Sequence, residues 1–250
     1  MTDTAAAEAT AKPAAVWEDF IDVFTQPSAV FARRRDGRYG MALLVLTALT
    51  AAVFFATRPL LQPMFDRMMD AQAEAMRRQN PNMTEEQRAS AQATMDRVSS
   101  IFVPLGAVAG PPVLVLLTAG VLFGVSRVGG APVNFAQAAT VVTYSQVPRL
   151  LGTLAGAGIL AFKDANDMPP LQGALAGPVI LLPRDASPVL VGLLSRFDLF
   201  TIWATVLVGI GVAVMARRDR SKGLVVAGLL WGVATLWALL SGLRAAAAMG

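Results

Sequence analysis

Long apolar stretches constrain this chain more than any other feature of its sequence. A helix rises about 1.5 Å per residue, so roughly twenty apolar residues are needed to cross about 30 Å of hydrocarbon. Five stretches approach this length, and we predict an all-α fold, a polytopic membrane bundle of five transmembrane helices. The predicted spans cover about residues 41–57, 101–125, 135–162, 197–216 and 223–243.

The composition agrees with a chain surrounded by lipid. Apolar and aromatic residues make up 55% of it and charged residues only 15%, whereas average soluble proteins carry about 25% charge. The chain has no Cys and no His, which excludes disulfides, metal sites built on these residues, and Ser-His or Cys-His catalysis. The three lysines, Lys12, Lys163 and Lys222, lie outside the predicted spans. We therefore predict no catalytic residue, no metal and no cofactor.

The distribution of basic residues predicts the orientation in the membrane. They cluster in three segments: Arg33, Arg34, Arg35 and Arg38 before the first span, Arg127 after the second, and Arg217, Arg218, Arg220 and Lys222 between the last two. Short loops rich in Arg and Lys stay in the cytoplasm. This places the N-terminus in the cytoplasm and the C-terminus outside. The net charge of +4 then reflects topology, and no nucleic acid partner is expected.

The segment before the first span has an amphipathic pattern. We expect residues 1–16 to be a disordered tail and residues 17–38 to form a cytoplasmic helix along the membrane surface. The predicted contacts with the membrane surface or a partner are the aromatic residues Trp17, Phe20, Phe24 and Phe31 and the basic residues Arg33, Arg34 and Arg35. The segment is either a simple membrane anchor or a docking face for a cytosolic protein.

Two polar loops follow on the other side of the membrane. Residues 62–100 are expected to form a helical hairpin or two broken helices, with Thr84 as an N-cap. Six methionines in this loop suggest a flexible packing surface rather than a copper site: Met64, Met68, Met69, Met76, Met83 and Met95. The Pro-rich residues 164–196 either lie on the outer surface or cover the bundle as a lid.

Polar residues in the third predicted span are the main candidates for a ligand site. A charge at this depth costs about 2.5–3.5 kcal/mol on insertion scales, so Arg149 needs a partner or an interface. We predict that Tyr144, Gln146, Arg149 and Asp198 contact a polar ligand or a lipid headgroup. A purely structural role for Arg149 is the alternative. Arg149 and Asp198 can form a buried pair only if they lie at similar depths in the membrane, and their expected depths differ. Alternatively, Arg149 extends to the cytoplasmic side if the third helix breaks at Pro148.

Helix-breaking residues and glycines in the spans are consistent with more than one function. Pro148 and the run Gly110-Pro111-Pro112 interrupt two consecutive spans, as in transporters that expose backbone groups to substrates. The glycines form small-residue faces, for which packing within the bundle is favoured, although a homo-oligomer is also possible. They are Gly152, Gly156, Gly158, Gly209, Gly211, Gly228 and Gly232.

Three stretches resemble a known family. They are residues 17–31, beginning Trp-Glu-Asp-Phe, residues 138–152 around Tyr144-Ser145, and residues 197–203, Phe-Asp-Leu-Phe-Thr-Ile-Trp. Together they resemble the Yip family, five-span membrane proteins named for their interaction with Ypt/Rab GTPases. The resemblance implies an all-helical bundle with a cytoplasmic N-terminus and, for eukaryotic relatives, a role in vesicle trafficking. The Ala- and Arg-rich composition is typical of a GC-rich bacterial chain, so a bacterial inner membrane is expected.

Two functions remain open from the sequence. The first is a non-catalytic membrane protein that organises lipids or protein partners at the cytoplasmic membrane. The second is a transporter, channel or lipid-translocating protein with a polar site near Arg149. They differ in what the bundle should contain, because a scaffold should be packed solid, whereas a translocating protein needs a cavity that reaches Arg149.

Overall fold

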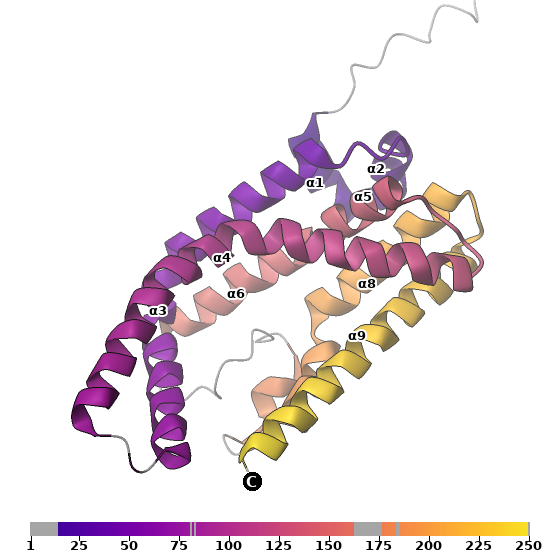
Figure 1. The fold of residues 1–250 in the computed structure, drawn as a ribbon. Coiled ribbons are helices and arrows are strands. Elements are labelled where there is room, and N and C mark those ends of the chain that lie inside the picture. The colour runs from indigo at the N-terminus through magenta and orange to yellow at the C-terminus, as the bar shows by residue number, and fades with distance from the viewer. Residues whose placement is uncertain (1–14, 81, 83, 163–176, 184–185, 250) are drawn as a thin grey trace, which may run out of the picture.

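The fold is helical throughout the part of the chain that can be described (Figure 1). The computed structural model describes residues 15–80, 82, 84–162, 177–183 and 186–249, and within these ranges it contains no strand. The expected disordered tail therefore lies almost entirely outside the described residues. The helices are α1 (Val16–Thr25), α2 (Pro27–Arg33), α3 (Gly40–Gln79), α4 (Glu85–Val128), α5 (Phe135–Ser145), α6 (Val147–Phe162), α7 (Pro188–Leu194), α8 (Leu199–Ala216) and α9 (Arg220–Met249), with short 3₁₀ helices η2 (Pro178–Leu181) and η3 (Ser195–Phe197).

Four helices in the described part of the chain are long and apolar enough to cross a bilayer. The apolar segments are Gly40–Leu60, Glu85–Val128, Leu199–Ala216 and Arg220–Ala247. They correspond to the first, second, fourth and fifth predicted spans. The fourth begins at Leu199 rather than at residue 197, because Asp198 is the N-cap of α8 and accepts hydrogen bonds from the amides of Phe200 and Thr201.

The third predicted span is divided into α5 and α6 at Gln146. Pro148 lacks an amide hydrogen and disfavours helical geometry at the residue before it, which favours a break here, whereas α4 continues through Pro104, Pro111 and Pro112. Neither piece alone reaches the length of a span, since α5 has 11 residues and α6 has 16. The two helices also have different neighbours. α5 packs against α4 and α8, whereas α6 packs against α3 and α8.

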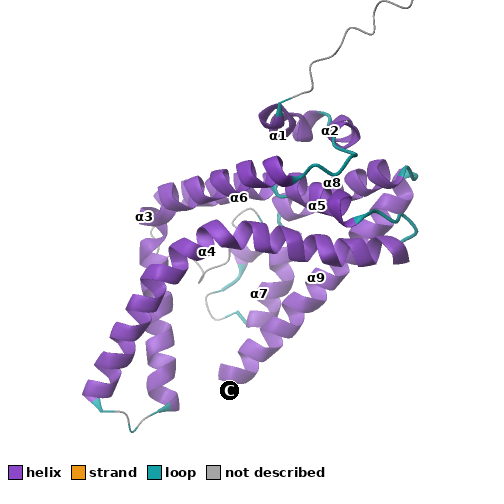
Figure 2. Cartoon of the chain, turned by 45° about the horizontal axis from the view of Figure 1, so that its top comes forward, coloured by secondary structure: helices purple, strands orange, loops and turns teal. Residues whose placement is uncertain are grey.

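Two helices extend far beyond the thickness of a bilayer. With 40 and 44 residues, α3 and α4 are about 60 and 66 Å long at about 1.5 Å per residue. Their distal parts form a long hairpin that projects away from the other helices (Figure 2). Thr84 begins α4 with a capping box, in which its hydroxyl accepts from the Gln87 amide at 3.3 Å and the Gln87 side chain accepts from the Thr84 amide at 3.0 Å. The predicted N-cap is therefore confirmed.

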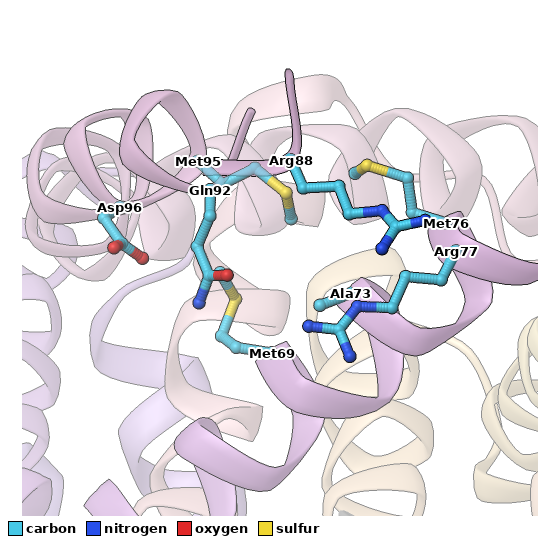
Figure 3. A pocket seen from close by; sticks show the side chains of 8 residues that line it. All are labelled: Met69, Ala73, Met76, Arg77, Arg88, Gln92, Met95 and Asp96. Atoms are coloured by element: carbon cyan, nitrogen blue, oxygen red, sulfur yellow. The ribbon is translucent and has the colours of Figure 1, made fainter. Parts of the chain in front are cut away.

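Methionines pack between the two helices of this hairpin. Met69, Met76 and Met95 line a small cavity of about 40 Å³ together with the side chain of Arg88 (Figure 3). Flexible thioethers suit such an irregular gap, so this arrangement favours a packing role for these three residues. The side chains of Met64, Met68 and Met83 lie outside what the structure describes.

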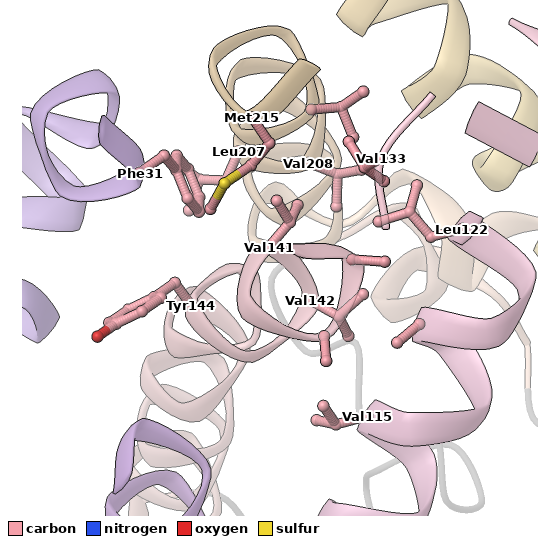
Figure 4. Packing of buried hydrophobic residues seen from close by; sticks show 14 of the residues in the cluster. Phe31, Val115, Leu122, Val133, Val141, Val142, Tyr144, Leu207, Val208 and Met215 are labelled. Atoms are coloured by element: carbon pink, nitrogen blue, oxygen red, sulfur yellow. The ribbon is translucent and has the colours of Figure 1, made fainter. Parts of the chain in front are cut away.

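The core lies around α5, the most enclosed helix of the bundle. All eight residues from Ala138 to Ser145 are buried. Val141 and Val142 meet Leu122 of α4 and Leu207 of α8 in a continuous apolar cluster (Figure 4). In contrast, large apolar side chains on the outside of α4 and α9 remain exposed, including Leu117, Leu236 and Trp237. Exposed apolar surface of this extent is typical of helices that face lipid.

Glycine permits the close contact between α8 and α9. A Cβ atom on Gly223 would overlap the carbonyl oxygen of Gly209, whereas a Cβ on Gly228 or Gly232 would meet no atom within 4 Å. The tight turn between the helices depends on Arg217, which adopts a left-handed conformation at the C-cap of α8. The predicted packing within the bundle is therefore confirmed for Gly209 and wrong for Gly228 and Gly232, and Gly223, which was not among the predicted glycines, packs against Gly209.

Candidate functional site

The N-terminal segment is docked onto the bundle as a cap. Phe20 and Phe31 are buried, and their rings meet Tyr144 of α5 at centroid distances of 5.6 and 6.4 Å. Phe24 contacts Trp203 of α8 at 5.9 Å. These three aromatic residues therefore contact protein, and the predicted contact with the membrane surface does not extend to Phe20 and Phe31.

A buried carboxylate holds this cap in place. The side chain of Asp19 is fully buried, and three donors surround it, two from the end of α2 and one from α5. Arg33 Nη2 donates to Asp19 Oδ1 at 2.7 Å, and Arg34 Nε donates to Oδ2 at 2.6 Å. The Tyr144 hydroxyl, which points away from the valine cluster in Figure 4, donates to Oδ2 at 3.2 Å. We call Asp19, Arg33, Arg34 and Tyr144 the cap cluster.

The two arginines of the cap cluster are held in their charged form. The hydrogen bond from Arg33 Nη2 to Asp22 Oδ2, at 2.6 Å, is the main cause that raises the pKa of Arg33, and Asp19 adds to it. Burial by itself lowers the pKa of Arg34, but the hydrogen bond and the charge of Asp19 outweigh this, so the pKa of Arg34 is raised. Both guanidinium groups therefore bind carboxylates of the same segment.

The outer face of the cap carries the remaining candidates for surface contact. Trp17 is 62% exposed and Ile21 is 60% exposed, and they lie one turn apart on α1. The Arg35 carbonyl accepts a hydrogen bond from the Gln137 side chain at 3.2 Å, which ties the end of the segment to α5. Of the predicted surface residues, Trp17 has the most exposed side chain, and the exposed Ile21, which belongs to the same apolar pattern in the sequence, lies beside it.

A second candidate site is an open cleft between α3, α4 and α6. Its volume is about 460 Å³. Leu46 and Phe54 of α3 and Leu114 of α4 supply apolar wall, while Gln146 and Arg149 supply polar groups from the break between α5 and α6. The other polar residues of the lining are Thr50 and Thr153, whose hydroxyls donate to carbonyls of their own helices. The Arg149 guanidinium is therefore the charged group of this cleft.

The structure separates the residues predicted to form one polar site. Tyr144 belongs to the cap cluster, Gln146 and Arg149 line the cleft, and Asp198 caps α8 with two hydrogen bonds of 3.0 Å to its Oδ1. Arg149 and Asp198 are close enough to interact electrostatically. Arg196, which was not predicted from the sequence, is close enough to interact with both. Among the described residues, Asp198 forms no ion pair within 4 Å with either arginine.

The Nε atoms of both arginines are buried without a hydrogen-bond partner among the described residues. Arg149 projects into the cleft from the start of α6, and Arg196 comes from η3, directly before the cap of α8. Neither arginine forms an ion pair with a carboxylate in the described part of the chain. The arrangement can therefore accept an anion, and the cleft beside Arg149 can accept apolar groups.

A comparison with protein families matches almost the whole bundle. A family model described as Yip1 domain matches residues 21–242, which extends from α1 to α9 and includes the cleft and every residue of the cap cluster except Asp19. The chain belongs to the Yip1 domain family. The Yip1 domain and the long apolar helices together make it a multi-pass membrane protein. No curated protein and no solved structure matches the chain.

Replacing the buried carboxylate tests the cap of this Yip1 domain protein. Asp19→Asn leaves two arginines facing a neutral group, and breaking a buried ion pair in this way costs about 3–5 kcal/mol. We expect α1 and α2 to undock, and trypsin to cleave faster at the arginines between residues 33 and 38. Asp22→Asn is the matched control, because Asp22 is partly exposed and its pair contributes about 1 kcal/mol or less. Equal cleavage rates for Asp19→Asn and the wild type would contradict the proposed role of Asp19.

Proposed function

We propose that this protein is a non-catalytic membrane protein that organises lipids, with the cleft between α3, α4 and α6 as its lipid-binding site. The observation that carries the proposal is the lining of the cleft. Apolar side chains from two membrane helices form its walls, and Arg149 adds one charged group at the break in the third predicted span. Acyl chains match such walls, and a polar headgroup matches the guanidinium.

The proposed topology has five spans, with α5 and α6 crossing the membrane together as the third. Contacts among the basic segments support this orientation. The Gln137 side chain binds the carbonyl of Arg35, and Gly130, three residues after Arg127, lies against the side chain of Lys222. The three Arg- and Lys-rich segments therefore lie at one end of the molecule, which we assign to the cytoplasm of a bacterial cell.

Filling the cleft tests the lipid-binding proposal. Gly110 lines the cleft, and a Cβ atom there meets nothing within 4 Å, so Gly110→Leu occupies the cleft without clashing with protein. We expect the variant, purified in mild detergent, to retain about tenfold less lipid per protein, because an overpacked site costs about 1–3 kcal/mol. Extracted lipid is quantified by mass spectrometry.

The control for this experiment lies on the same helix. Gly120 is exposed and does not line the cleft. As at Gly110, a Cβ atom on Gly120 meets nothing within 4 Å. Gly120→Leu should therefore retain as much lipid as the wild type. Equal lipid content in both variants would show that the cleft is not the binding site.

A second candidate function is lipid translocation. The supporting observation is that the cleft reaches Arg149 at a helix break. A translocating protein needs a cavity at this residue, whereas a solidly packed scaffold does not. Broken helices expose polar backbone groups within membranes only where they line a cavity or are buried in protein. The protein would then move lipid headgroups past Gln146 and Arg149.

Reconstituted vesicles distinguish translocation from static binding. If the second function holds, the wild type exchanges a fluorescent phospholipid between leaflets, and Arg149→Ala abolishes that exchange because no charge then attracts the headgroup. The control is Arg127→Ala, in the last turn of α4 and outside the cleft, which should exchange lipid like the wild type. Small-solute flux is recorded from the same vesicles to test for a channel or transporter. Wild-type rates equal to those of empty vesicles would eliminate the candidate.

The outer face of α1 is the proposed contact with the inner membrane surface. Trp17 and Ile21 present an apolar strip beside the basic segments, a combination typical of interfacial helices. A fluorophore on Ile21→Cys should be quenched by brominated lipids, and the same fluorophore on the exposed Ser90→Cys, in the distal hairpin of α3 and α4, should be quenched much less. The chain has no native cysteine, so each label is unique. Equal, weak quenching would instead assign this face to a protein partner.

A further inference from the structure

The charges around Arg149 do not balance within the described residues. Arg149 and Arg196 contribute two positive charges, and Asp198 contributes the one carboxylate found to interact with both. One oxygen of this carboxylate is already occupied, because Asp198 Oδ1 accepts from the amides of Phe200 and Thr201. The cluster therefore carries an excess of one positive charge beside an apolar cleft.

An unneutralised guanidinium is unfavourable in this environment. A charged side chain within a bilayer costs about 2.5–3.5 kcal/mol even on the most permissive scales. The Nε atoms of both arginines are buried without a hydrogen-bond partner in the described part of the chain, so hydrogen-bonding capacity remains unused as well. An anion with several acceptor oxygens would supply both the missing charge and the missing acceptors.

We propose that Arg149 binds the phosphate of an anionic phospholipid whose acyl chains lie in the cleft, and that Arg196 strengthens this binding through its charge. The inference rests on the proposed function, because it identifies the class of lipid that the cleft holds. The Arg149 guanidinium lines the same cleft as the apolar side chains of Leu46, Phe54 and Leu114. This arrangement favours a lipid over free phosphate. Free phosphate has no apolar part to bury there.

The same cluster discriminates between headgroups. A zwitterionic phospholipid carries an ammonium group next to its phosphate, and two neighbouring arginines repel that group. Asp198, the carboxylate close by among the described residues, is engaged as a helix cap and has limited capacity to bind the ammonium group. A headgroup with a net negative charge, such as phosphatidylglycerol, brings the phosphate without the added cation. The cleft should therefore prefer anionic over zwitterionic lipids of the same chain length.

Competition between two lipids tests this preference. The purified protein is mixed with equal amounts of phosphatidylglycerol and phosphatidylethanolamine that carry identical acyl chains, and bound lipid is counted by native mass spectrometry. We expect the wild type to favour the anionic lipid about tenfold, which corresponds to about 1.4 kcal/mol. Arg149→Gln should abolish the preference, Arg196→Gln should reduce it, and Arg149→Lys should retain most of it. Arg127→Gln, outside the cleft, should not change it.

The outcomes separate this inference from the proposed function. If the wild type binds both lipids equally while Gly110→Leu still lowers total binding, the inference is wrong and the cleft remains a lipid site. If Gly110→Leu and the wild type bind the same small amount of either lipid, the proposed function fails as well. Displacement of the bound lipid by inorganic phosphate alone would assign Arg149 to a phosphate site and overturn the choice of a lipid.

Discussion

The break between α5 and α6 is the constraint on which both candidate sites depend. A turn at Gln146, two residues before Pro148, divides the third predicted span, and its two halves pack against different helices, α5 against α4 and α6 against α3. Tyr144, just before the break, reaches the carboxylate of Asp19 in the cap. Gln146 and Arg149, at the break and just after it, line the cleft instead. One interruption of the backbone therefore positions residues of both the cap and the cleft.

The cap and the cleft use charge in opposite ways. In the cap cluster, Asp19 is buried but receives hydrogen bonds from Arg33, Arg34 and Tyr144, so its charge is fully compensated by protein. At the cleft, Asp198 is the carboxylate that interacts with Arg149 among the residues the structure describes, but it caps a helix and forms no ion pair with Arg149. A compensated buried charge holds structure together, whereas an uncompensated one favours binding of a ligand.

The sequence predicted the parts of this structure that depend on local pattern. Apolar length identified four spans, Pro148 identified the division of the third predicted one, and the cost of a charge in lipid drew attention to Arg149. The interruption predicted at Gly110-Pro111-Pro112 was wrong, because α4 continues through these residues. Asp19 was missed as a cap residue because acidic residues of an amphipathic helix normally face water. A signal existed, since Asp19 follows Val16 by three positions and precedes Val23 by four, which places it on the buried face of α1.

The cleft could not be predicted from the sequence, because it depends on a gap between three helices far apart in the chain. Leu46, Gly110 and Arg149 have no local pattern that brings them together, and their contacts depend on how α3, α4 and α6 pack. The same holds for Arg196, whose position near Arg149 arises from the packing of η3 against α9, where the indole of Trp231 donates to the Arg196 carbonyl at 3.4 Å.

Photo-crosslinking with a phospholipid that carries a diazirine on its acyl chain tests the central claim most directly. The protein is reconstituted with this lipid, irradiated, digested and mapped by mass spectrometry. A lipid held in the cleft predicts adducts concentrated on the cleft-lining residues of α3 and α4, well above those on the equally lipid-facing Leu236 and Trp237 of α9. Adducts spread evenly over α4 and α9 would contradict the account, because they would mean that the cleft is ordinary lipid-exposed surface.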